Sequence, residues 1–185
     1  MGSIKERREV YDLVNKSRWI QGVWNKEPDF IKFIYREDLI LLRCIIRRDK
    51  TAGNLVCYIG VPEGNVYYEK DTNEAYIPKF MDFSFTGFAK HYDKEFKGEK
   101  KHWYLGFDLG RDDDLSPGLQ IFDASTEEVG AKVAEILERV KKEVGEMPKK
   151  TYKDVKFAEK LLVELAQQII KDQKAFIVAK ARKGK

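Results

Sequence analysis

Two segments of this chain combine polar side chains suited to ligand chemistry with strand-like alternation. Residues 80–88 have the sequence FMDFSFTGF and residues 102–108 the sequence HWYLGFD. Side chains of a strand point alternately to the two faces of a sheet, so each segment has one polar side. If the strands pair through the loop 89–101, one sheet face gathers Asp82, Ser84, Thr86, His102, Tyr104 and Asp108. We interpret this face as a candidate ligand site, with a plain solvated face as the alternative.

Cations and aromatic rings near these segments indicate a ligand that carries phosphate. Arg43 and Arg47 are four residues apart in an apolar segment, so they share a strand face and could bind a phosphate in a bidentate manner. Arg111 follows the second polar strand. Tyrosines interleaved with Lys and Arg fit a pocket that stacks a base and neutralises phosphates. Ordinary packing of the aromatics and charge protection of a strand edge are the alternatives.

An acidic loop after the second polar strand is a candidate metal site. Asp112, Asp113 and Asp114 are consecutive, and Asp108 precedes them by one short turn. Asp108 with Asp112 or Asp114 could begin the oxygen shell that Mg²⁺ or Ca²⁺ prefers. The spacing is not that of an EF-hand, and a solvated acidic turn explains the same residues. The sequence therefore leaves a metal undecided, and we predict no cofactor.

The usual catalytic motifs are absent from the sequence. It contains no phosphate-binding P-loop, no Gly-x-Ser-x-Gly, no His-Glu-x-x-His and no Cys-x-x-Cys. His91 and His102 are its two histidines. Most catalytic triads and histidine-rich metal sites would therefore lack the histidines that they need. Cys44 and Cys57 lie in apolar runs and are interpreted as buried thiols. These absences alone do not decide between an enzyme and a binding protein.

Periodicity predicts the elements that must position these residues. The predicted elements are a short amphipathic helix over 4–16, strands over 39–48, 55–61, 80–88 and 102–108, a helix over 125–144, and a second helix that opens at 151–154 and has apolar residues up to Ile169. The strands precede the two long helices, which indicates the α+β class. We expect an antiparallel sheet of four or more strands with helices packed on one face, the two C-terminal helices being antiparallel.

Composition sets the class of protein. The chain has 185 residues, 43% of them hydrophobic, and a formal net charge of +4. We expect one domain over residues 1–172 and a basic tail over 173–185, whose five cations and no acid leave −1 for the rest. Without a long apolar run or a signal-peptide pattern, we expect a cytoplasmic protein that binds no membrane. The near-neutral body makes nucleic acid an unexpected partner.

Several short motifs resemble a known family. They are GNLVCYIGVP at 53–62, WYLGFD at 103–108 followed by Asp114 and Ser116-Pro117, and TYKDV at 151–155. In order and spacing over residues 19–172, the chain resembles a family of small uncharacterised tailed-phage proteins. Its members have the motifs G-Y-V-G-V-P-x-x-H-P, V-H-G-G-L-T and W-W-I-G-F-D-C-A-H-x-G-D.

The differences from that family bear on mechanism. In register, Asn65, Asp82 and Arg111 occupy the positions of the family's three recurring histidines, whereas Asp108 and Asp114 keep its aspartates. If those groups form an acid/base or metal site, this chain retains the carboxylates and lacks the neutral bases. The resemblance therefore implies a phage protein that acts by binding.

The resulting hypothesis is a phage-encoded counter-defence protein of a bacterial host that sequesters a nucleotide-derived immune signal. Tyr104 would stack on the base, Arg43 or Arg111 would pair with phosphate, and Asp82 and Asp108 would bind ribose hydroxyls. The remaining candidate residues on the site are Ser84, Thr86 and Asp114. One alternative is a metal-dependent phosphodiester or glycosidic hydrolase that uses Asp82, Asp108, Asp112 and Asp114. Another is an inhibitor that binds a host protein, and a homo-oligomer is left open.

Overall fold

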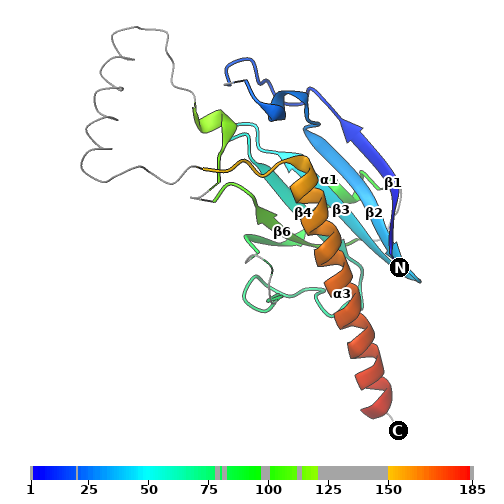
Figure 1. Ribbon diagram of the computed structural model, residues 1–185. Helices are drawn as coiled ribbons and strands as arrows, with labels where there is room; N and C mark the ends of the chain where they lie inside the picture. The colour runs from blue at the N-terminus through cyan, green and yellow to red at the C-terminus, as the bar shows by residue number, and fades with distance from the viewer. Residues whose placement is uncertain are drawn as a thin grey trace, which may run out of the picture.

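Six strands form one antiparallel sheet that a long helix crosses on one face (Figure 1). The computed structural model describes residues 2–19, 21–77, 80, 83–96, 101–111, 114–120 and 150–183. In sheet order the strands are β1 (Ser3–Val10), β2 (Phe30–Glu37), β3 (Ile40–Arg48), β4 (Leu55–Val61), β6 (Trp103–Asp108) and β5 (Phe85–Phe88). The helices are η1 (Val23–Lys26), α1 (Lys90–Asp93), η2 (Pro117–Gln120) and α3 (Val155–Lys183).

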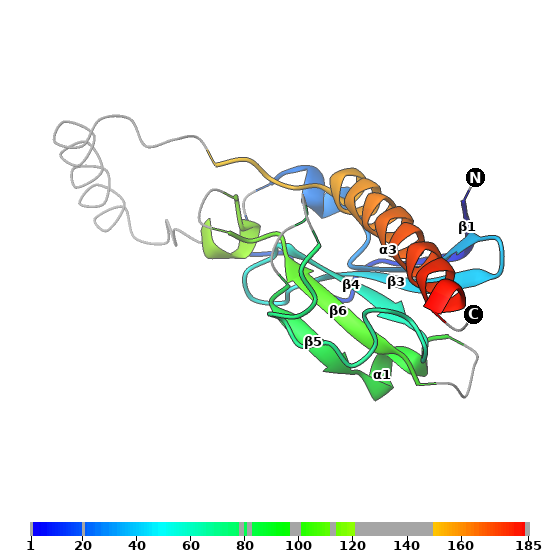
Figure 2. The ribbon, with the colours of Figure 1, turned by 90° about the horizontal axis from the view of Figure 1, so that it is seen from below.

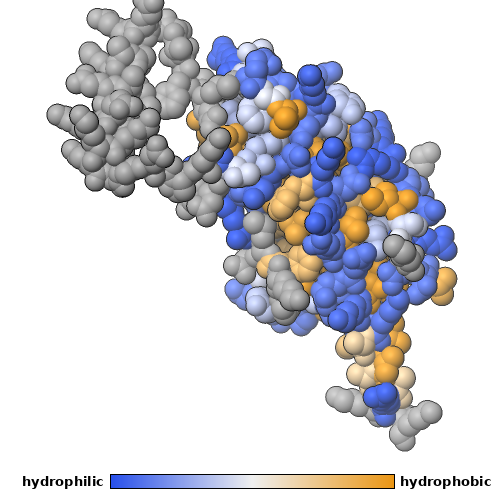
Figure 3. All heavy atoms as spheres, viewed as in Figure 1, coloured by the Kyte–Doolittle hydropathy of each residue, from blue (hydrophilic) through white to orange (hydrophobic). Residues whose placement is uncertain are grey.

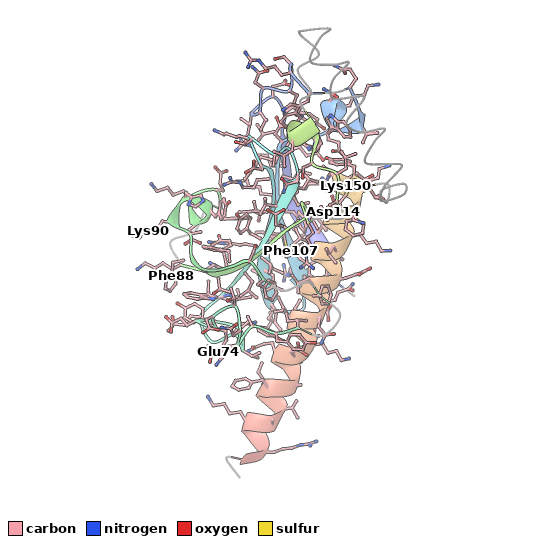
Figure 4. All side chains as sticks on the ribbon, turned by 90° about the vertical axis from the view of Figure 1, so that its left-hand side faces the viewer. Glu74, Phe88, Lys90, Phe107, Asp114 and Lys150 are labelled. Atoms are coloured by element: carbon pink, nitrogen blue, oxygen red, sulfur yellow. The ribbon has the colours of Figure 1, made fainter. Side chains whose placement is uncertain are left out.

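The expected α+β class with an antiparallel sheet of more than four strands is confirmed. The arrangement of the helices differs from the expectation, because α3 and the short α1 lie on opposite sides of the sheet (Figure 4). The second long helix was expected over 125–144, which lies outside the described residues. The antiparallel pair of C-terminal helices is therefore not confirmed.

The N-terminal segment is a strand and not the expected helix. Residues 3–10 pair with β2 in register on both sides of a bulge, between Lys5 and Arg8. Pairing with a neighbouring strand decides the conformation here, because local helical spacing is a weaker influence than tertiary context. The segment is an edge strand, and its run of charged side chains protects that edge from pairing with other chains.

The strand register sorts the side chains of the sheet into two faces. The helix face, which lies under α3, is apolar over most of its area, and its fully buried side chains come from all four central strands. They include Ile31, Phe33, Tyr35, Leu42, Cys44, Ile46, Cys57, Ile59, Leu105 and Phe107. From α3, Ala158, Leu162, Leu165, Ala166 and Ile169 pack onto them. Burial of these groups is the main source of stability of the fold.

Both cysteines belong to this core. Cys44 and Cys57 are buried and free, as the sequence predicts. Burial raises the pKa of both thiols well above the usual range. They are therefore inert packing groups rather than nucleophiles.

One end of the helix face is closed by a buried ion-pair network around Arg48. Its Nε lies 3.0 Å from Asp29 and its Nη2 lies 2.9 Å from Glu27. Arg48 also donates to the Tyr152 hydroxyl at 2.7 Å, just before α3 begins. The helix itself starts with Asp154 as cap, which accepts a hydrogen bond from the Phe157 amide at 2.7 Å. These contacts fix the direction in which α3 leaves the sheet.

The helix α3 is longer than the sequence predicts. The apolar residues expected for this helix end at Ile169, and residues 173–185 were expected to form a basic tail, whereas α3 continues to Lys183. At 1.5 Å per residue its 29 residues span about 44 Å. It runs obliquely over β3 and β4 (Figure 2), and its C-terminal end extends beyond the sheet (Figure 1). Within the described residues, no helix has the length and apolar character that a membrane crossing requires.

Candidate functional site

The predicted pairing of the two polar strands occurs, but its register separates the candidate residues. Thr86 lies opposite Leu105 and Gly87 lies opposite Tyr104. Residues directly opposite each other share a face, so Thr86 is on the helix face and Tyr104 on the other. The expected common face of Ser84, Thr86 and Tyr104 is therefore wrong.

The predicted and observed faces differ because of where β5 begins and how it pairs with β6. The strand β5 begins only at Phe85, and Ser84 lies in a bend whose amide donates to the Gly106 carbonyl at 2.9 Å. A shift of one residue in register moves every side chain of a strand to the opposite face. Asp82, the third candidate on this segment, lies outside the described residues.

Two candidates do meet, at Asp93 of α1. Its Oδ1 accepts hydrogen bonds from Arg43 at 2.8 Å and from the Tyr104 hydroxyl at 3.0 Å. His102 Nδ1 lies 3.7 Å from the same oxygen. This cluster lies on the sheet face opposite α3, beneath the segment 89–96.

The chain's own aromatic rings fill the Tyr104 side of the cluster, whereas Arg43 and His102 line a groove. Tyr104 is fully buried, and its ring packs against Tyr92 with centroids 5.6 Å apart. A Cβ at Gly60 would come within 2.7 Å of the Tyr104 ring, so only glycine permits this close approach. Tyr104 cannot stack on a base in this arrangement. Its contribution is to hold Asp93 beside Arg43.

The remaining candidates lie at the other end of β6 and serve the chain's own structure. Asp108 accepts hydrogen bonds from Asn54 Nδ2 at 2.5 Å and from the Gly110 amide at 2.6 Å, and burial raises its pKa. Asp114 is buried and lies 3.7 Å from Lys153, next to α3. Arg111 is exposed in the turn that precedes Asp114.

The acidic loop therefore gives little support to a metal site. Among the described residues, no group of three or more His, Cys, Asp or Glu side chains is arranged to hold a metal ion. Asp112 and Asp113 lie outside those residues. Asp108 and Asp114 are each engaged with groups of their own chain.

A different part of the same sheet face collects cations. On β1, β2 and β3, the register directs several basic side chains away from α3. We call this group the basic strip, and it consists of Lys5, Arg8, Lys32, Arg36 and Arg47. Within it, Arg8 lies directly opposite Lys32, and like charges in that position repel each other.

Most cations of the basic strip lack a carboxylate partner. Lys32 lies 3.5 Å from Glu95, but Lys5, Arg8, Arg36 and Arg47 form no ion pair with any other described residue. Arg47 donates instead to the Tyr92 hydroxyl at 3.2 Å, and Arg36 to the Asp38 carbonyl at 3.2 Å. Their positive charges are therefore held in place without being neutralised.

The dimensions of the basic strip follow from sheet geometry. Arg36 lies near one end of β2, and Phe30, opposite Arg47, lies at the other end. Six residues at about 3.3 Å each separate them by about 20 Å. Phe30 is half-buried and adds an aromatic ring beside Arg47. A strip of this length exceeds what one phosphate group needs.

Sequence reasoning missed the basic strip because it missed two strands. Residues 4–16 were expected to form a helix, and no strand was predicted over 30–37. The signal was present: FIKFIYRE alternates buried Ile31, Phe33 and Tyr35 with partly exposed neighbours. The prediction that Arg43 and Arg47 share a face is confirmed by the register.

Comparison with known proteins adds no assignment. No protein-family model, no curated protein and no solved structure matches this chain. The resemblance to tailed-phage proteins stays an expectation drawn from its motifs.

Proposed function

We propose that this protein binds a phosphate-bearing, nucleotide-type ligand on the basic strip. The observation that carries the proposal is a set of cations, Lys5, Arg8, Arg36 and Arg47, that share one sheet face and form no ion pair with a described carboxylate. The ligand site is thereby moved from β5 and β6, where Tyr104 and Tyr92 fill the space, to β1, β2 and β3.

The electrostatics of the strip favour an anion. Arg8 and Lys32 are placed directly opposite each other, and like charges in that position repel; Glu95 lies 3.5 Å from Lys32, whereas Arg8 has no ion pair with a described carboxylate. A phosphate between them would turn this repulsion into two charge-assisted hydrogen bonds. Arg47 is held by the Tyr92 hydroxyl, so little side-chain entropy is lost when it binds.

The length of the strip favours a ligand with more than one phosphate. Cations spread over about 20 Å can contact a dinucleotide or a nucleoside diphosphate derivative at several points. Phe30, beside Arg47, offers a ring on which a base can stack. Because arginine stays protonated at neutral pH, these residues suit phosphate binding and not general base catalysis.

This activity fits the role that the motifs imply. A small phage protein that binds nucleotides without converting them would lower the free concentration of a nucleotide-derived immune signal in its host. We therefore propose sequestration as the function, with Arg43 and Asp93 as residues that support the strip rather than contact the ligand.

The test is isothermal titration calorimetry with a cyclic dinucleotide, ADP-ribose and a short oligothymidylate, at about 50 and 200 mM salt. We expect binding of at least one of the two nucleotides. Arg8→Gln and Arg47→Gln should each weaken it at least about tenfold, because a hydrogen bond to a charged group contributes about 1.5 kcal/mol or more.

The matched control is Arg7→Gln on the same strand. Arg7 bonds to Glu9 and Glu159, away from the basic strip, so its replacement should leave affinity unchanged. No heat with either nucleotide, or equal affinity in the Arg8 and Arg47 variants, would contradict the proposal. Tighter binding of the oligothymidylate would replace the small ligand with single-stranded nucleic acid.

A further inference from the structure

The C-terminal end of α3 projects beyond the sheet and exposes apolar side chains. We call residues 174–183 the α3 tip, and at 1.5 Å per residue it is about 15 Å long. Phe176, Ile177 and Val178 are 49%, 53% and 51% exposed. In Figure 3 the projecting end carries hydrophobic surface that the body of the molecule does not cover.

The chain's own core leaves all three of these residues about half exposed. Consecutive residues of a helix are about 100° apart, so three in a row place apolar surface around more than half of the helix. The N-terminal part of α3 differs, because its apolar residues such as Leu162 and Leu165 form one buried stripe. Contiguous exposed apolar surface of this kind is typical of interaction sites.

A groove lies directly beside the α3 tip. It has a volume of about 680 Å³ and is bounded by the tip, the β2–β3 turn and the segment after β4. Its apolar lining includes Ile34, Leu39, Leu41, Pro62, Phe96 and Ile177. Leu39 is 91% exposed, so the wall of the groove continues the apolar surface of the tip.

The charges of the groove and of the tip are complementary. Glu6 and Glu63 line the groove and form no ion pair with any described residue, whereas Arg43 and His102, which also line it, face Asp93. Lys180 and Arg182 on the tip also have no ion pair among those residues. Where a cation of the tip does reach the acids of the β2–β3 turn, it pairs closely: Lys174 lies 2.8 Å from both Glu37 and Asp38.

We propose that the occupant of this groove is the α3 tip of a second copy of the chain. Two tips would lie antiparallel across a two-fold axis, each in the groove of the other copy. Such an interface is self-complementary, since one chain supplies both the apolar basic tip and the apolar groove with acidic residues. It buries Phe176, Ile177 and Val178 against Leu39 and Leu41, and it brings Lys180 toward Glu63 of the other copy. No residue of the basic strip lines the groove, but the two adjoin, since Lys5 lies opposite Ile34 and Arg36 lies opposite Leu41.

The oligomeric state of the full chain, measured by sedimentation velocity over a range of concentrations, tests this inference. We expect a concentration-dependent species of twice the 21.6 kDa chain mass. Ile177→Glu should raise the dimer dissociation constant at least about tenfold, because it places a charge in the apolar contact. The matched control is Phe157→Glu, an exposed apolar residue at the other end of α3, which should dimerise as the unaltered chain does.

A charge exchange tests the orientation of the two copies. Glu63→Lys should weaken the dimer, and adding Lys180→Glu should restore it. A chain that stays monomeric at the highest soluble concentration would overturn the proposal. So would a dimer that Ile177→Glu leaves intact while circular dichroism shows the fold unchanged. A monomer whose tip variants lose binding to an oligonucleotide would assign the tip to nucleic acid instead.

Discussion

The two faces of this sheet are built from the same strands yet differ in chemistry. Along β2, Ile31, Phe33 and Tyr35 point to the helix face and are fully buried, whereas Lys32 and Arg36 point to the opposite face. The helix face is closed by α3 and holds the fold together. The opposite face carries the basic strip, whose cations add nothing to the core. Alternation alone thus separates the buried core residues of β2 from its cations.

The face opposite α3 is itself divided. Over β4, β5 and β6, Tyr58, Tyr92 and Tyr104 pack on one another and leave no room for a ligand. Over β1 and the adjoining edge of β2, Arg8 and Arg36 are exposed to solvent. The difference shows that polar residues on a strand do not mark a site unless the neighbouring segment leaves them uncovered. Substitutions of matched residues on the two faces can test this comparison.

The largest effect is expected from two phenylalanines of the same strand on opposite faces. Phe33→Ala should lower the free energy of unfolding by about 3–5 kcal/mol, since it leaves a cavity on the fully buried helix face. Phe30→Ala, at a half-buried position beside Arg47, should cost less than about 2 kcal/mol. Urea unfolding of the two variants measures both values. Equal losses would show that the two faces contribute alike to stability.

A second comparison uses two adjacent arginines. Arg48→Met should destabilise the protein by about 3–5 kcal/mol, because Glu27 would lose its ion-pair partner and buried Asp29 would keep only Lys16. Arg47→Met removes one hydrogen bond to Tyr92 and should cost only about 0.5–1.5 kcal/mol. Thermal unfolding and calorimetry should therefore separate them: Arg48 matters for folding, and Arg47 for ligand affinity. Loss of stability in the Arg47 variant comparable to that in the Arg48 variant would place Arg47 in the structural network.

The smallest expected effect is a change in stability whose sign distinguishes a structural role of Arg8 from a binding role. Arg8→Glu replaces a like-charged cross-strand pair with Lys32 by an opposite-charged one, so stability at low salt should rise by about 0.2–1 kcal/mol. The same change should reduce nucleotide affinity more strongly than Arg8→Gln does, because it repels phosphate. A variant that is more stable and binds less would indicate that the basic strip is maintained for its ligand. If stability falls instead, Arg8 stabilises the fold by a contact other than this pair.

The sequence predicted the central elements well. The segments 39–48 and 55–61 form β3 and β4, and the segment 102–108 forms β6 within one residue. Their apolar and β-branched composition is decisive because these strands are buried in the middle of the sheet. The edge of the sheet formed by β1 was predicted less well. The segment of β1 was expected to be a helix, and β2, which pairs with it, was not predicted. A charged edge strand has no apolar alternation of its own, and its conformation is set by the partner strand.

The candidate site shows the same limit at the level of single residues. Alternation placed Tyr104 and Asp108 on one face of β6, which the register confirms, and it could not show that β5 is offset from β6 by one residue. Nor could it show that the segment 89–96 covers Tyr104. Asp93, the residue on which Arg43 and Tyr104 converge, gave no signal, because it lies in a charged segment that alternation does not assign to either strand.

By itself, the sequence determined the class of fold, the buried thiols and the alternation that separates apolar from charged side chains. These properties depend on the local spacing of residues, which any strand or helix displays alone. Tertiary structure decided which strands pair, in which register, and which part of a face stays uncovered. Those outcomes depend on contacts between residues distant in sequence, such as Arg8 with Lys32 or Arg48 with Tyr152, and no local pattern encodes them.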